Sequence, residues 1–346
     1  YWILPFAILG FIFYKADAGV LVDTVRSANP LLYVLGVLFF PLSLIFSATR
    51  WKVLLGQYLG VEERLGFAVK QYFMGLSISI FLPGSIGLDI YRIAMAGRRY
   101  QNYTRNIAVV LEEKLMSLAV CVGLVLGLAP WLNIQQDASM LGSITDIALS
   151  ITAGGLLGLV ALFLFAKLGV VRRMAGFVTR QLQAVFASWL RRLNIDPSRA
   201  ATLPALNVLF APMTRPASLA SVALISCLIF VALAIANQLF LNALSYDLSF
   251  IDSLFVVAVL FVVVSLPISF AGFGMREGGY IIVLGMFGIP AETALVVSVF
   301  ALSGLLLNYA IGGLFIYLSR NEHPELVVPP VGEQSAQPGI GTEKNS

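Results

Sequence analysis

Two pairs of charged residues lie inside apolar stretches of this sequence, each directly after a glycine-containing turn. Asp89 and Arg92 follow a Pro-Gly-Ser-Ile-Gly turn, and their spacing of three residues puts both side chains on one face of a helix. Arg276 and Glu277 follow a second turn, at residues 266–274. A charged group at the centre of a bilayer costs roughly 2.5 to 3.5 kcal/mol even on a lenient insertion scale, so we expect both pairs to avoid lipid.

Arginine side chains and exposed backbone N–H groups are donors that bind phosphate. We therefore interpret Arg92 and Arg276 as ligands of a lipid phosphate, with N–H groups of the glycine turns and of half-helix N-termini as further donors. Asp89 and Glu277 would balance the arginines or hold a cationic headgroup. The alternative is that both pairs are ion pairs that only hold the chain together. The candidate substrate-binding residues are Gly84, Ser85, Gly87, Asp89, Arg92, Glu113, Lys114, Gly272, Gly274, Arg276 and Glu277.

A third charged group, Glu112-Glu113-Lys114, begins five residues into an apolar run at 107–130. At 1.5 Å per helical residue, the three side chains lie about 8 to 10 Å below the start of that run. Two interpretations stay open: the residues sit at the membrane interface, or they line the same polar cavity as the two pairs. Polar residues in other apolar runs, such as Asn237 and Asn308, are typical of hydrogen bonds between helices.

Several classes of chemistry find no support in the residue types. The one histidine, His323, lies in a polar stretch near the C-terminus, and Cys121 and Cys227 lie far apart inside apolar runs. Histidine-based catalysis, a zinc site and a disulfide framework are therefore not indicated. No Gly-x-x-x-x-Gly-Lys-Ser/Thr phosphate loop is present, so we expect no ATP hydrolysis by this chain and no cofactor.

The composition indicates that the bilayer is the solvent of this chain. Its 346 residues are 59% hydrophobic and only 12% charged, with a mean hydropathy of +0.90. A soluble domain carries about twice that share of charge. The net charge of +4 comes from basic residues gathered in short stretches between apolar runs, which is typical of the positive-inside pattern and not of nucleic-acid binding.

A helix needs about 20 apolar residues to cross the hydrocarbon layer. Two long apolar regions, 71–96 and 253–289, are broken near their middle by proline, glycine and charge. These breaks predict helical hairpins that re-enter the membrane without crossing it. The fold class expected is thus an all-α polytopic membrane protein. Six runs approach the length of a span: 1–14, 31–49, 107–130, 147–166, 217–243 and 292–318.

The charges between the runs predict the topology. Residues 167–216 carry eight basic side chains and one acidic side chain, so they are expected on the cytoplasmic side, whereas 131–146 and 244–252 contain no Lys or Arg. With three crossings in each half, 1–130 and 147–318, the second half is inserted upside down, which predicts an inverted repeat. A 184-residue offset between Pro83 and Pro267 brings the spans of both halves into register.

Two segments outside the spans have their own patterns. Residues 172–193 place apolar side chains at helical spacing among arginines, which predicts an amphipathic cytoplasmic helix that anchors to anionic lipid or docks a partner. Residues 321–346 are rich in Pro, Gly, Glu and Ser without periodicity, so we expect a disordered cytoplasmic tail.

Three stretches carry a resemblance to a known family: 50–55, 82–92 and 267–290. Together they resemble the membrane domain of lysylphosphatidylglycerol synthetases, a flippase-like family, over about residues 1–320. The resemblance implies lipid translocation, with residues of the two glycine and charge motifs as the site. Leu88 stands where members often have a second glycine. Because no aminoacyl-transferase domain follows in this sequence, the resemblance implies the transport half only.

We therefore expect a protein of the bacterial inner membrane that moves a polar-headed, phosphate-containing lipid between leaflets. The alternatives are a membrane-embedded enzyme that acts on lipid-linked sugars or phospholipids, and an accessory subunit of a lipid-modifying complex. The expected partners are the lipid substrate and the surrounding membrane lipids. A second copy of the chain or a lipid-modifying enzyme could join them, and no nucleic acid is expected.

Overall fold

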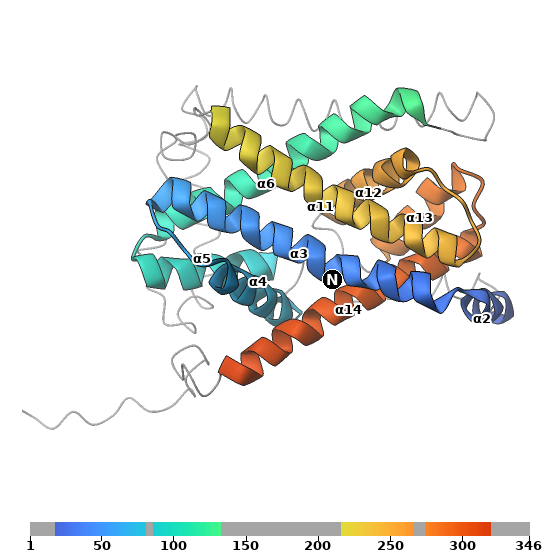
Figure 1. The fold of residues 1–346 in the computed structure, drawn as a ribbon, viewed down its shortest axis with the longest axis horizontal. Coiled ribbons are helices and arrows are strands. Elements are labelled where there is room, and N and C mark those ends of the chain that lie inside the picture. Colours follow the sequence, from blue (N-terminus) through green and yellow to red (C-terminus); the bar gives the residue numbers. More distant parts are fainter. Residues whose placement is uncertain (1–17, 81–85, 133–215, 266–273, 320–346) are drawn as a thin grey trace, which may run out of the picture.

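The computed structural model describes residues 18–80, 86–132, 216–265 and 274–319, and in these ranges the regular structure is helical (Figure 1). The predicted spans 1–14 and 147–166, the amphipathic segment 172–193 and the tail 321–346 lie outside the described residues. The elements in chain order are α2 (Ala18–Ser27), α3 (Pro30–Leu59), α4 (Leu65–Ser79), α5 (Ile86–Tyr100), α6 (Tyr103–Leu128), the short 3-10 helix η1 (Ala129–Trp131), α11 (Pro216–Ala243), α12 (Phe250–Ser265), α13 (Met275–Gly285) and α14 (Ala291–Ser319).

Three of these helices, α3, α11 and α14, are long and apolar enough to cross a membrane. They correspond to the predicted runs 31–49, 217–243 and 292–318. The protein is therefore an all-α polytopic membrane protein. Helix α6 has a comparable length of 26 residues, but its Glu112-Glu113-Lys114 triplet makes it less apolar than the other three.

Helix α3 is longer than its apolar run. The predicted run stops at residue 49, whereas the helix continues to Leu59 and ends at Gly60, whose backbone adopts the left-handed conformation with φ 68°. No proline lies between Thr49 and Gly60, so the helix continues after the apolar pattern ends. As a consequence Arg50, which lies directly after the apolar run, is a buried helical residue.

Both predicted breaks separate short helices. Helices α4 and α5 flank residues 81–85, and α12 and α13 flank residues 266–273. Within the described residues these four helices have 11 to 16 residues each. In each pair the helices pack against one another. Their re-entry from opposite faces, and the inverted repeat, stay predictions.

Helices α3 and α11 lie side by side through the centre of the molecule, and α14 crosses below α3 (Figure 1). The close approach depends on small residues: a Cβ atom added at Gly36 of α3 would lie 2.5 Å from the Phe240 ring of α11. One apolar core joins α11 to α14. A second core joins α3, α4 and α6 around Trp51 and Leu54, and this core surrounds the charged residues described next.

Candidate functional site

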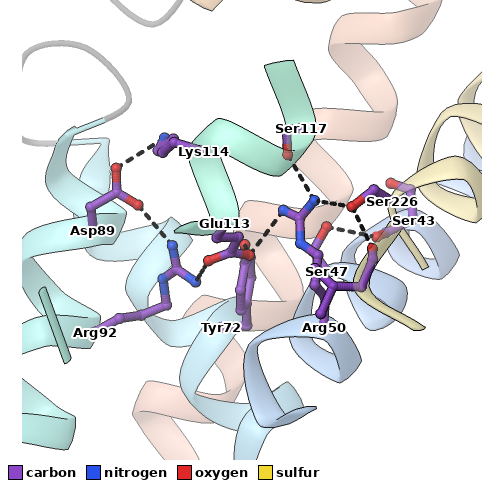
Figure 2. Close-up of polar contacts among 11 residues, drawn as sticks. Ser43, Ser47, Arg50, Tyr72, Asp89, Arg92, Glu113, Lys114, Ser117 and Ser226 are labelled. Carbon is purple, nitrogen blue, oxygen red and sulfur yellow. Dashed lines mark hydrogen bonds and ion pairs between the residues drawn. The ribbon is translucent and has the colours of Figure 1, made fainter. Parts of the chain in front are cut away.

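A chain of charged side chains joins α3, α5 and α6, and Glu113 of α6 lies at its centre (Figure 2). One carboxylate oxygen of Glu113, Oε2, accepts a hydrogen bond from Arg92 Nη1 at 2.5 Å. The other, Oε1, accepts from Arg50 Nη2 at 3.0 Å and from Tyr72 Oη at 2.9 Å. Glu113 therefore bridges two arginines that belong to different helices.

Arg92 has two carboxylate partners and two aromatic neighbours. Its Nη2 donates to Asp89 Oδ1 at 2.7 Å, one helical turn earlier on α5. Its guanidinium carbon lies 4.4 Å from the centre of the Tyr72 ring and 5.7 Å from that of Trp51, distances typical of cation–π contacts. Only 2% of the residue is exposed. The predicted pairing of Asp89 with Arg92 is present, and Glu113 adds a second carboxylate that the sequence did not assign to this arginine.

Arg50 connects the charge chain to the long central helices. Its Nη1 donates to Ser117 Oγ of α6 at 2.7 Å and to Ser226 Oγ of α11 at 2.9 Å. Through Arg50 and Glu113, the charge chain thus touches α3, α6 and α11 at once (Figure 2). The sequence analysis missed Arg50, Tyr72, Ser117 and Ser226 as members of the site. A signal existed for Arg50, because Ser43, Ser47 and Arg50 lie on one face of a helix. It is easily overlooked, since Arg50 comes directly after the end of the apolar run at residue 49.

Lys114 forms the accessible end of the charge chain. Its Nζ lies 2.9 Å from Asp89 Oδ2, and 50% of its side chain is exposed. Helix α6 begins at Tyr103, so Lys114 lies about 16 Å along it. The three cations Lys114, Arg92 and Arg50 face the two carboxylates of Asp89 and Glu113, which leaves one positive charge in excess.

The carboxyl groups of Glu112 and Glu113 are both buried, so both point into the helix bundle and not to an exposed interface. Their partners differ. Glu112 Oε2 accepts a hydrogen bond from the hydroxyl of Tyr58 on α3, away from the two arginines of the charge chain. The three adjacent charged residues therefore have different roles. Glu112 binds a tyrosine, Glu113 bridges two arginines, and Lys114 is half-exposed.

The second predicted pair lies at the start of α13. Glu277 Oε1 accepts from Arg276 Nη2 at 2.7 Å and from Ser298 Oγ of α14 at 3.3 Å. Glu277 Oε2 accepts from the backbone N–H of Gly274 at 2.6 Å. Gly274 has a φ of 78°, a conformation that favours glycine. The carboxylate thus occupies a helix N-terminal donor that we had expected to serve a ligand.

Other predicted site residues have simpler placements. Gly87 is a buried residue in the first turn of α5. Gly84, Ser85 and Gly272 lie outside the described residues. The structure therefore brings Asp89, Arg92, Glu113 and Lys114 into one cluster, and pairs Arg276 with Glu277 in another.

A smaller ion pair lies in the loop before α4, outside the spans. Glu63 Oε1 accepts from Arg99 Nε at 2.8 Å and from Tyr100 Oη at 2.6 Å. Partial burial raises the pKa of Glu63, but the hydrogen bonds from Tyr100 and Arg99 outweigh it, so the pKa of this carboxyl is lowered from its ordinary value. The contact ties the end of α5 to the loop after α3.

Fold and site together define a helical membrane protein with a buried charge chain between its spans. Residues 2–312 match the family described as the lysylphosphatidylglycerol synthase TM region. The chain belongs to this family, as the glycine and charge motifs indicated. Comparison with curated proteins and with solved structures finds no match.

Proposed function

We propose that this protein moves a polar-headed, phosphate-containing lipid between the leaflets of the bacterial inner membrane. The observation that carries the proposal is the charge chain from Lys114 to Arg50. It lies beside helices that can span a membrane, has one positive charge in excess, and ends in a half-exposed lysine. The family match supports a lipid-related role at a coarser level.

The excess positive charge favours an anionic group such as a phosphate. Buried ions are stabilised when each has a partner of opposite charge, and Arg92, Glu113 and Asp89 already satisfy one another. Lys114 shares Asp89 with Arg92, so an incoming phosphate would find its first cation at Lys114. Lysine and arginine both bind phosphate through charge-assisted hydrogen bonds.

A polar headgroup needs a path lined by polar groups, because an ionised group cannot enter bare hydrocarbon at thermal energies. In the proposed mechanism, the two broken helix pairs re-enter from opposite faces, and the halves of the protein move against each other around the charge chain. The distribution of Lys and Arg supports a cytoplasmic C-terminus.

Vesicles that contain the purified protein and a trace of fluorescent phospholipid test this proposal. If the protein moves lipid, a membrane-impermeant quencher removes more fluorescence than the outer leaflet alone contains. Lys114→Gln should slow the movement at least about tenfold, because it removes the proposed charge-assisted hydrogen bond from Lys114 to the lipid phosphate, worth about 1.5 to 3 kcal/mol. Lys52→Gln, which removes a positive charge of α3 outside the charge chain, is the matched control.

Arg92→Ala should abolish movement, but it removes one of the two cations that Glu113 and Asp89 each contact, so its folding has to be verified by size-exclusion chromatography. Equal movement with wild-type protein, Lys114→Gln and protein-free vesicles would contradict the proposal. Mass spectrometry of the recovered lipid separates the alternatives: a changed lipid mass supports an enzyme, and unchanged lipid without movement supports an accessory subunit.

A further inference from the structure

Glu112 and Glu113 are neighbours on α6 with opposite surroundings. Glu113 accepts hydrogen bonds from two arginines and a tyrosine. Glu112 is 0% exposed, and its Oε2 accepts one hydrogen bond, from Tyr58. Its second oxygen, Oε1, has no hydrogen-bond partner in the described part of the chain. The surroundings of Glu113 therefore stabilise an ionised carboxylate, whereas those of Glu112 favour a protonated carboxyl group.

Three arginines bind groups next to Glu112, namely Glu113 and the backbone of Tyr58. Arg50 of α3 and Arg92 of α5 both bind Glu113. Arg105, two turns before Glu112 on α6, donates to the backbone carbonyl of Tyr58 at 3.0 Å.

Among the described helices, the others that pack against α6 bring no cation. Helix α11 contains no acidic or basic residue, and α12 contains only Asp252, which binds Ser249 where that helix begins. Among the described residues, Tyr58 is the titratable group with which Glu112 interacts.

An ionised carboxylate without water and without a cation is strongly disfavoured, and such a group takes up a proton instead. A metal ion fits less well, because calcium and magnesium take about six or more oxygen ligands. The described residues contain no group of three or more His, Cys, Asp or Glu that could hold a metal. The geometry around Glu112 thus favours a proton as the ligand.

We propose that Glu112 is a proton-binding site that couples lipid movement to the proton gradient. The coupling rests on the proposed function, and the proton site itself does not. A hydronium ion gives its proton to the carboxylate, an O–H bond forms on Glu112, and water is left. Loss of the proton favours a state in which water or Arg105 reaches the carboxylate. Because Glu113 is the next residue of the same helix, a movement of α6 that exposes Glu112 also alters the charge chain.

Infrared spectroscopy of the purified protein tests the proton site without any transport. At about pH 7, where ordinary carboxyl groups are ionised, the wild-type protein should show the C=O band of a protonated carboxylic acid, and Glu112→Gln should remove it. Glu62→Gln, which changes an exposed loop acid, should leave the band unchanged. A band of equal intensity in Glu112→Gln, or no band in the wild type, overturns the proposal.

Tyr58→Phe provides a second variant in case Glu112→Gln does not fold. Tyr58→Phe removes the hydrogen bond to Glu112 and keeps the acid, so the band should persist at a higher frequency. An unshifted band in Tyr58→Phe assigns the protonated acid to another residue and overturns the proposal.

Vesicles with an imposed pH gradient test the coupling. The rate of lipid movement by wild-type protein should change by up to about tenfold per pH unit, the limit for one proton, whereas Glu112→Gln should move lipid at one rate in all gradients. If Glu112→Gln responds to the gradient as the wild type does, the coupling is wrong. If the wild type moves no lipid, the proposed function fails, and the infrared band still decides whether Glu112 holds a proton.

Discussion

Glu113 shows how one side chain can hold several helices together in an apolar surrounding. Its two oxygens accept hydrogen bonds from Arg50 and Arg92, which are otherwise distant in the sequence and have little exposed surface. Arginine keeps its charge when it is buried. The two buried guanidinium groups therefore need the negative charge of Glu113. The stability of this part of the protein should therefore depend on Glu113 more than on any exposed charge.

Replacement of Glu113 by alanine should destabilise the protein by about 3 to 5 kcal/mol, because it leaves the buried Arg50 without its carboxylate and Arg92 with Asp89 alone. Thermal unfolding of the detergent-solubilised protein measures the effect. The half-exposed Lys114 is the control, since Lys114→Ala breaks a partly solvated pair worth about 1 kcal/mol or less. Similar unfolding temperatures for both variants would show that the bridge contributes little.

The contact of Glu63 with Arg99 and Tyr100 should make the stability of the folded protein depend on pH. Because the pKa of Glu63 is lowered in the folded protein, the contact contributes stability above the pKa of Glu63 in the unfolded chain, and this contribution is lost as the pH falls through the lower folded value. The unfolding temperature of the wild type should exceed that of Glu63→Gln at about pH 6, and the difference should shrink below about pH 4. A difference that grows on acidification would contradict this sign.

At the scale of the element, close helix contacts depend on glycine. A Cβ atom added at Gly312 of α14 would lie 2.0 Å from the backbone oxygen of Phe73 in α4. The contact brings α14 against the first broken pair, where Ser77 Oγ also donates to the Tyr309 carbonyl at 2.7 Å. The two helices could not approach so closely with a larger residue at position 312.

Gly312→Ala should therefore destabilise the protein by about 1 to 3 kcal/mol, since α14 has to move away from α4. The adjacent glycine is a matched control, because a Cβ atom at Gly313 would meet no atom within 4 Å. Gly313→Ala should be neutral or stabilising, as alanine favours a helix over glycine by about 1 kcal/mol. Unfolding temperatures of the two variants decide, and a stable Gly312→Ala protein would rule out the close contact.

At the scale of the whole molecule, the two broken pairs are predicted to enter the membrane from opposite faces, and cysteine labelling tests this prediction. In a chain with Cys121 and Cys227 replaced by alanine, single cysteines at positions 83 and 267 should react with impermeant thiol reagents from opposite sides of the membrane. Labelling of both positions from one side would contradict the inverted repeat. The same experiment gives the orientation that the basic segments predict.

The sequence by itself determined that the protein lies in a lipid bilayer, that its fold class is all-α, where two apolar regions are interrupted, and to which family the chain belongs. Long apolar runs need a bilayer, and backbone polar groups in a bilayer need helices, so residues 31–49, 217–243 and 292–318 predicted spans without any tertiary information. Proline, glycine and charge marked the breaks that now separate α4 from α5 and α12 from α13. These features depend on local composition, which one sequence contains in full.

Only the tertiary structure decided which charges meet. Arg50 and Glu113 are 63 residues apart, and Arg50 and Ser226 are 176 apart, so no local pattern could pair them. Glu112 and Glu113 are identical and adjacent, yet the 100° turn between successive helical residues aims one at Tyr58 and the other at two arginines. The partner of a buried charge depends on how helices pack around it, and that packing is a property of the folded chain.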